Sequence, residues 1–129
     1  MTLILCVDDR GGLMFNRRRQ SQDRLVRTDM LRLCGERPLA VSPYTARQFA
    51  PEDRVKVVDQ PGEEDIFFLE DLPPQPLLER AEKLVLYHWN RVYPGDVHIA
   101  LPPQGWSLEE QVEFPGHSHE TITREVYSR

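Results

Sequence analysis

The stretch DIFFLEDLPPQPLLERAEKLVLYHWN, residues 65–90, decides the fold. Its first part, DIFFLED (65–71), is apolar in the middle and has the composition of a buried strand. A proline-rich segment then introduces a helix, QPLLERAEK (75–83), with a proline at a tolerated first-turn position. The longest strand, KLVLYHWN (83–90), follows. Strands that alternate with helices in this way predict a mostly parallel sheet.

The segments before this stretch repeat the alternation. Residues 2–8 (TLILCVD) form an apolar run typical of a central strand buried on both faces. After a predicted loop at 10–20, Ser21 is the expected N-cap of a helix, with Asp23 in its first turn and Gly35 after its last. The apolar residues at helical spacing in this helix are Val26, Met30 and Leu33.

The remaining elements complete the sheet. Residues 38–42 (PLAVS) and 54–59 (RVKVVD) predict two strands, with a short helix from Tyr44 between them. Two strands near the end, WSLEEQVEF (106–114) and TITREVYSR (121–129), are expected to extend the sheet in the antiparallel sense. The predicted fold class is therefore α/β: a mostly parallel mixed sheet flanked by helices, with an antiparallel C-terminal strand pair.

Length and composition limit the class of protein. A chain of 129 residues without repeats or linkers predicts one domain, residues 1–129, with a real hydrophobic core. No apolar run reaches the length of a membrane span and no signal peptide is evident, so we expect a cytoplasmic protein. Two cysteines, Cys6 and Cys34, make neither a disulfide framework nor a zinc site. The net charge of −5 makes nucleic acid an unexpected partner.

Four phrases, in order, resemble the dihydrofolate reductase family over most of the chain. LILCVDDRGGLMFN resembles the first strand and loop of that family, and RPLAVSPYTARQF resembles its second strand and the helix start after it. EDIFFLED with PLLERAEKLVLYHW resembles the strand, helix and strand on its cofactor side. YPGDVHIALPPQGWSLEEQVEF and the final VYSR resemble its ending. The resemblance implies a dihydrofolate-reductase-like fold, with a strand–helix piece deleted between RVKVVD and DIFFLED.

The departures from the family concern its cofactor site. The phrase Gly-Arg-x-Thr, which meets the cofactor phosphates in the family, is here Ser42-Pro43-Tyr44-Thr45, so that only Thr45 remains. The family's Gly-Gly, where the backbone approaches the pyrophosphate, is here Glu70-Asp71. One pair of like charges about 4 Å apart costs roughly 4 kcal/mol at an effective dielectric constant of about 20. The resemblance therefore implies the scaffold and argues against the usual reductase chemistry.

The substrate side of the family site also differs. The Pro-Trp of its substrate loop is replaced by Gln20-Ser21, and the threonine that supports its folate-binding acid is replaced by Tyr87. Asp23 stands near the position of the family's catalytic acid. We expect no bound cofactor.

The arginine-rich segment FNRRRQSQDR, residues 15–24, is a candidate anion site. Its arginines surround a helix start, whose free N–H groups favour a phosphate, and guanidinium groups bind phosphate and carboxylate through two hydrogen bonds. The candidate ligand-binding residues are Arg17, Arg18, Arg19, Asp23 and Arg24, and the resemblance adds Thr45 and Tyr87. The alternative is a solvated basic loop whose arginines pair with the acids nearby in the sequence, Asp8, Asp9 and Asp23.

A second candidate is the phrase GHSHET, residues 116–121. His117, His119 and Glu120 have side chains of the types that bind zinc. Small proteins similar to this one are sometimes labelled ribonuclease Z, a family that requires a His-x-His-x-Asp-His phrase. Here the phrase stops at His-Ser-His-Glu, and the chain is too short for that family's fold. The alternative is a polar loop between the last two strands.

An acidic run offers a third surface. Its members are Glu63, Glu64, Asp65, Glu70 and Asp71. Such a run is usually a solvated edge, and the alternative is a surface that binds a protein.

Three functions remain open on the sequence. The first is a non-catalytic protein that holds a small anionic or nucleotide-like ligand in a degenerate reductase-like cleft, or that engages a protein partner; a phage or mobile-element protein that sequesters a nucleotide or inhibits a host enzyme fits this profile. The second is an NADPH-dependent reductase with an altered cofactor mode. The third is a metal-dependent nuclease or hydrolase that uses His117 and His119. The sequence leaves the oligomeric state open.

Overall fold

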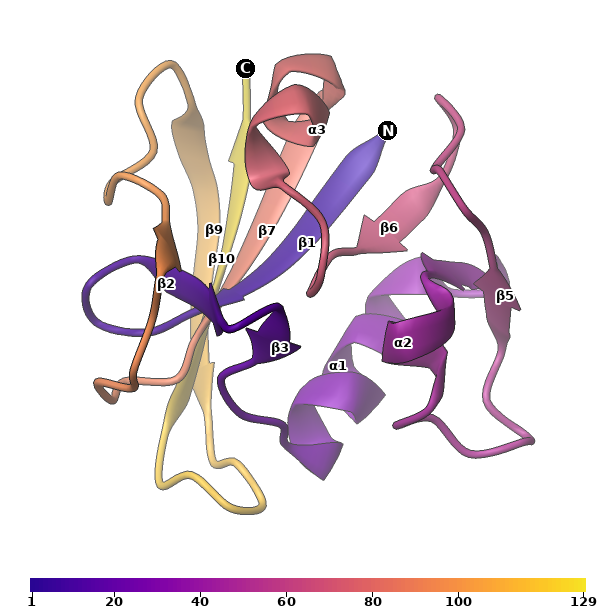
Figure 1. Cartoon of the computed structure of the whole chain (residues 1–129), viewed down its shortest axis with the longest axis horizontal. Helices are drawn as coiled ribbons and strands as arrows, with labels where there is room; N and C mark the ends of the chain where they lie inside the picture. The colour runs from indigo at the N-terminus through magenta and orange to yellow at the C-terminus, as the bar shows by residue number, and fades with distance from the viewer.

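Strand and helix segments alternate along most of the chain and build a mixed sheet with helices on both faces (Figure 1). The computed structural model describes all 129 residues. The strands of the large sheet are β1 (Thr2–Val7), β4 (Leu39–Val41), β5 (Val55–Val57), β6 (Ile66–Phe68), β7 (Lys83–His88), β9 (Ser107–Phe114) and β10 (Ile122–Ser128). The helices are α1 (Arg24–Cys34), α2 (Pro43–Ala46) and α3 (Pro74–Arg80).

The seven strands lie in the order β5-β4-β6-β1-β7-β10-β9. The five strands from β5 to β7 pair in parallel, and β10 pairs antiparallel with both β7 and β9. β6 and β7 lie on either side of β1, and α3 is the crossover between them. The structure thus confirms the predicted mixed α/β sheet with its antiparallel C-terminal pair. Several strands are shorter than predicted: the apolar run 65–71 contributes only Ile66–Phe68.

The central strand β1 is buried on both faces, as its unbroken apolar sequence predicted. Leu3 and Leu5 point into one core cluster, which α3 and a small second sheet cover. Ile4 and Cys6 point into another, which α1 covers with Val26, Met30 and Cys34. Cys34 takes the inward place that was predicted for Leu33, a residue that is 41% exposed.

The segment 10–20, predicted as a loop, forms strands of a second sheet. This sheet contains β3 (Arg18–Arg19), β2 (Gly12–Phe15) and β8 (Val97–His98), in that order. Gly11 begins it with φ of +77°, and a Cβ there would lie 2.1 Å from the carbonyl oxygen of Ile99, so only glycine fits. The small sheet lies next to β1, which β2 contacts, and its strand β3 directly precedes α1 along the chain (Figure 1).

The N-cap of α1 is Asp23, so the prediction of Ser21 was wrong by two residues. Both are good capping residues. Asp23, rather than Ser21, is the N-cap because its carboxylate also accepts hydrogen bonds from the loop between β9 and β10. The sequence does not show this contact. At the other end, Gly35 follows the helix with φ of +62°, as predicted.

The outer strand β9 leaves one backbone edge unpaired and seven of its eight residues exposed. Its side chains include Glu109, Glu110 and Glu113, and two exposed apolar residues, Leu108 and Val112. None of the helices in the chain has the length and apolar character needed to cross a membrane.

Candidate functional site

The arginine run forms a two-stranded hairpin rather than a loop. β2 and β3 pair antiparallel through a turn at Asn16 and Arg17, both with positive φ (55° and 61°), as hairpin turns of two residues require. The N–H of Asn16 donates to Asp96 Oδ2 at 2.9 Å, which ties the turn to a neighbouring loop. Arg17 and Arg18 are exposed and Arg19 is partly buried. The hairpin therefore separates the three arginines: Arg17 and Arg18 face solvent, and Arg19 turns toward the large sheet.

Arg19 makes an ion pair with Glu70, which follows β6. Its Nε donates to both Glu70 carboxylate oxygens at 3.1 and 3.0 Å, and the two side chains are 19% and 5% exposed. The guanidinium lies 4.3 Å from the ring centroid of Tyr44, whose hydroxyl accepts the N–H of Arg19 at 3.0 Å. Gln48 Nε2 donates to Glu70 Oε1 at 2.7 Å. These contacts fix β3 against the carboxyl end of β6 and the segment around α2.

Burial raises the pKa of Glu70, and the hydrogen bond and charge of Arg19 lower it again by less. Asp71 accepts a hydrogen bond from Ser42 Oγ at 2.9 Å, and Asp65 pairs with Lys56 Nζ at 2.6 Å. The prediction of a continuous acidic surface was therefore wrong, because Glu70 is a buried, paired residue. The alternative prediction, that the arginines pair with acids nearby in the sequence, is wrong for Arg19, because its partner is the distant Glu70.

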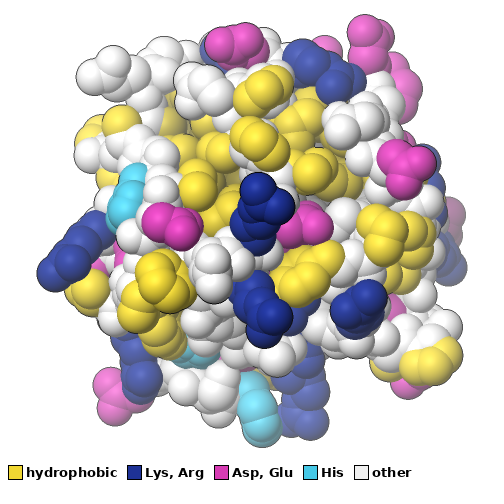
Figure 2. Space-filling model, viewed as in Figure 1, with side chains coloured by type: hydrophobic (Ala, Val, Ile, Leu, Met, Phe, Trp, Pro, Cys, Tyr) yellow, Lys and Arg dark blue, Asp and Glu magenta, His cyan; other side chains and the backbone are white.

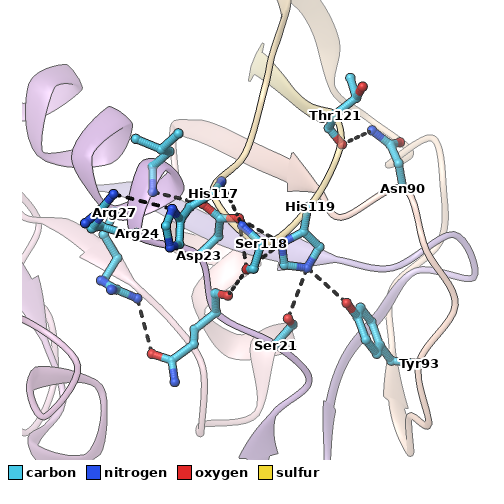
Figure 3. A network of polar contacts seen from close by, with 12 residues as sticks. Ser21, Asp23, Arg24, Arg27, Asn90, Tyr93, His117, Ser118, His119 and Thr121 are labelled. Carbon is cyan, nitrogen blue, oxygen red and sulfur yellow. Dashed lines mark hydrogen bonds and ion pairs between the residues drawn. The ribbon is translucent and has the colours of Figure 1, made fainter.

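Asp23 is the centre of a second network (Figure 3). Besides capping α1 through the N–H of Leu25 (2.9 Å), its carboxylate accepts the N–H groups of His117 and Ser118 at 2.9 Å each, with a second His117 contact at 3.0 Å. Its side chain is fully buried. Burial alone would raise the pKa of Asp23, but these hydrogen bonds and that of His119 outweigh it and hold the pKa far below the usual value.

Gly116 allows this loop to reach Asp23. A Cβ at position 116 would lie 2.8 Å from Asp23 Oδ2 and 2.7 Å from the carbonyl oxygen of His119. Because Gly116 has no side chain, the backbone N–H groups of His117 and Ser118 can come within hydrogen-bond distance of the carboxylate.

His119 lies in the same network, with its side chain only 2% exposed. Its Nδ1 is 2.9 Å from Asp23 Oδ2, and since the carboxylate can only accept, Nδ1 carries a proton. Its Nε2 is 3.1 Å from Ser21 Oγ and 2.9 Å from the hydroxyl of Tyr93. Trp89 stacks on the imidazole, with the ring centroids 4.6 Å apart and the planes at 22°.

The three candidate metal ligands do not converge. His119 binds Asp23, while Glu120 is exposed and His117 is exposed beside Arg24, with 3.4 Å between His117 Nδ1 and Arg24 Nη2. The structure contains no group of three or more His, Cys, Asp or Glu residues that could hold a metal ion.

Tyr87 and Thr45, which the resemblance added, are both fully buried. The hydroxyl of Tyr87 donates to Asp29 Oδ2 at 2.6 Å, and Arg124 donates to both oxygens of the same carboxylate at 2.8 and 2.9 Å. Burial and the neighbouring Asp29 carboxylate raise the pKa of Tyr87 well above its usual range. The N–H of Thr45 donates to Ser42 Oγ at 3.2 Å.

The predicted site residues thus fall into separate groups. Arg17 and Arg18 are on the exposed hairpin, Arg19 is paired with Glu70, and Asp23 with Arg24 is beside the β9–β10 loop. Thr45 is a hydrogen-bond partner of Glu70 and so belongs with Arg19, whereas Tyr87 is in none of these groups. Sequence reasoning missed Ser21 and Tyr93 as partners of His119, because 98 and 26 positions separate them from it.

A pocket of about 330 Å³ lies beside the hairpin. Its lining residues are Phe15, Asn16, Arg18, Arg19, Gln20 and Pro94. Basic side chains lie over β3 and α1 in the centre and lower half of the face shown in Figure 2, with acidic side chains among them. Neither Arg17 nor Arg18 takes part in an ion pair. The exposed cationic groups at the pocket are therefore open to an external anion.

Comparisons with known proteins agree with this architecture. No protein-family model matches the sequence, and no curated protein matches it. Among solved structures, a dihydrofolate reductase from Enterococcus faecalis, complexed with NADP(H) and RAB-propyl, matches 99% of this chain and 95% of its own, with a TM-score of 0.68 and 11% sequence identity. The chain therefore has a dihydrofolate-reductase-like fold, in agreement with the expectation from the four sequence phrases.

Proposed function

We propose that the protein binds a small anionic, nucleotide-like ligand at the arginine hairpin and does not carry out the nicotinamide-dependent reduction of the enzymes that share its fold. The observation that carries the proposal is the position of Arg18. It lines the 330 Å³ pocket, is exposed and makes no ion pair, while Arg17 extends beside it from the turn. A guanidinium group that is not paired with a protein carboxylate keeps its N–H donors available for two hydrogen bonds to a phosphate.

The argument against reduction rests on Glu70. In the family, the matching position is a glycine that lets the backbone approach the cofactor pyrophosphate. Here a buried carboxylate occupies it, with Arg19 bound across it. A pyrophosphate bound here would have to displace Arg19 and would then lie against the negative charge of Glu70. Repulsion of roughly 4 kcal/mol for each pair of like charges would oppose its binding.

Direct binding measurements test the proposal. Isothermal titration with AMP, ADP, ATP and inorganic phosphate should give binding for at least one of them, and NADPH should not be oxidised when a reducible substrate is present. Arg18→Ala should weaken that binding by about tenfold or more, since it removes a charged hydrogen-bond donor. Arg32→Ala is the matched control, because Arg32 is an exposed arginine in the last turn of α1, away from the hairpin.

The outcomes separate the three functions. Binding of NADPH with turnover of a reducible substrate would overturn the proposal in favour of a reductase. Absence of binding to any of the anions would also overturn it and would favour a protein partner. If Arg18→Ala leaves the binding unchanged, the anion binds elsewhere than at the hairpin, and the proposed site is wrong.

A further inference from the structure

Three side chains next to the hairpin form a chain of hydrogen bonds that anion binding does not require. Ser21 Oγ is 3.1 Å from His119 Nε2, and His119 Nδ1 is 2.9 Å from Asp23 Oδ2 (Figure 3). We propose that Ser21, His119 and Asp23 form a nucleophile–base–acid triad that hydrolyses a carboxylic ester or thioester. This activity goes beyond the proposed function, and only the choice of an anionic substrate, below, rests on it.

Asp23 and His119 have the arrangement that activates a hydroxyl group. The fully buried carboxylate of Asp23 accepts the Nδ1 proton of His119, which leaves Nε2 as the basic nitrogen on the side of Ser21. Three backbone N–H groups and the stack on Trp89 fix the carboxylate and the imidazole in place. The base is therefore held in one orientation, as the role demands.

Ser21 is on the accessible side of the network. It is partly exposed and lies between β3 and α1, whereas His119 is enclosed behind it. The pocket of about 330 Å³ is lined by Gln20 and Pro94, the chain neighbours of Ser21 and Tyr93. Ser21 itself does not line this pocket, and a substrate with its carbonyl at Ser21 would extend from there toward it.

Backbone donors for a developing oxyanion are also present. The N–H groups of Gln22 and Asp23 have no acceptor in the protein. They immediately follow Ser21 and precede the first turn of α1, where the helix dipole favours negative charge.

The chemical step balances with groups that are in place. Ser21 Oγ attacks the carbonyl carbon while its proton moves to His119 Nε2, and the tetrahedral intermediate expels the alcohol or thiol, which takes that proton. Water then attacks the acyl-serine bond, again giving its proton to Nε2, and Ser21 recovers it as the carboxylic acid leaves. No oxidant, metal or cofactor is consumed.

Tyr93 sets a second, specific expectation. Its hydroxyl is 2.9 Å from the same Nε2, and a neutral imidazole nitrogen accepts one hydroxyl proton at a time. Tyr93 thus competes with Ser21 for the base. Tyr93→Phe removes the competitor and leaves Ser21 as the one hydroxyl on Nε2, so the reaction should become faster.

The position of Arg18 on the wall of the same pocket indicates the class of substrate. An ester whose acyl or leaving group carries a carboxylate or phosphate would place that charge at the exposed arginine while its carbonyl meets Ser21. This part of the inference depends on the proposed anion site, and the triad itself does not.

A neutral fluorophosphonate probe tests the triad without the arginines. The intact protein should gain the mass of one phosphonyl group, and peptide mapping should place it on Ser21. Ser21→Ala should lose the adduct, the control Ser107→Ala on exposed β9 should keep it, and Tyr93→Phe should acquire it faster. Failure of Ser21 to react, or an adduct on another residue, overturns the proposal even if a His119 variant proves too unstable to study.

Ester hydrolysis separates the two proposals. With 4-nitrophenyl acetate, Ser21→Ala should reduce the rate by roughly a hundredfold or more, and the control Arg32→Ala, on the exposed last turn of α1, should leave it unchanged. With an ester of a dicarboxylic acid, Arg18→Ala should slow hydrolysis as well. If Arg18→Ala does not slow hydrolysis of the dicarboxylic ester, the anionic substrate is refuted and the triad is retained. If the rate does not depend on Ser21, the triad is refuted, whatever the arginines bind.

Discussion

Replacing Arg19 with alanine removes its ion pair with Glu70 together with the packing of its guanidinium on Tyr44. The change removes the donor to both carboxylate oxygens and leaves a carboxylate that is 5% exposed, with Gln48 (at 2.7 Å) and Thr45 as its remaining side-chain partners. Breaking a buried pair from one side costs about 3–5 kcal/mol. Because the Arg19 side chain is 19% exposed, we expect the lower end, a loss of about 3 kcal/mol in the free energy of unfolding.

Urea denaturation at pH 7 measures this loss. With an m-value of about 1.5 kcal/mol per molar urea, the midpoint should fall by about 2 M. Arg17→Ala is the matched control on the exposed turn and should change the free energy of unfolding by no more than about 0.5 kcal/mol.

A second change tests the physical reason. Adding Glu70→Gln to Arg19→Ala removes the unpaired charge and keeps an amide that Gln48 can bond, so the double variant should recover about 2 kcal/mol. The single variant should also regain stability as the pH falls, because burial already raises the pKa of Glu70 and a protonated carboxyl needs no arginine. A loss below about 1 kcal/mol in Arg19→Ala, or additive effects in the double variant, would refute the claim that this pair holds β3 to the sheet.

Three further changes test the interior networks. Asp23→Asn should cost about 2–3 kcal/mol at pH 7; since the folded-state pKa of Asp23 is held far below the ordinary value of 3.8, its contribution is fully present above 3.8 and is lost progressively as the pH falls from there through the lowered pKa, so the difference between wild type and variant in urea titrations should be smaller at pH 3 than at pH 7. Gly116→Ala should cost about 2 kcal/mol, because a Cβ would lie 2.8 Å from Asp23 Oδ2, whereas Gly62→Ala, with no neighbour closer than 3.4 Å, should stay within about 0.5 kcal/mol; equal effects would contradict the packing argument. Tyr87→Phe should lower the melting temperature by about 5 °C through loss of the hydrogen bond to Asp29, and an unchanged melting curve would show that this bond contributes nothing net.

The sheet could be predicted because its information is local. The run Thr2–Val7 is apolar at every position but the first, and such a run fits only a strand covered on both faces. The alternation of strands and helices then fixed the parallel pairing, and the antiparallel end followed from two successive strands without a helix between them.

The hairpin and the site could not be predicted in this way. Asn16-Arg17 makes a turn with two positive φ values without the glycine that usually indicates it. Glu70 is 51 positions from Arg19, and His119 is 96 positions from Asp23, so only the folded chain shows that they meet. Ser21 and Asp23 have equal claims to cap α1 from sequence, and the N–H groups of the distant β9–β10 loop decide between them.

The ion pair between Arg19 and Glu70 also constrains how this chain can change by descent. A step that alters either residue alone passes through a protein with an unpaired buried group, and a loss of about 3 kcal/mol raises the unfolded fraction roughly a hundredfold. Replacement of Glu70 is therefore costly unless Arg19 changes with it. Among homologous sequences, the two positions should therefore be inherited and replaced together.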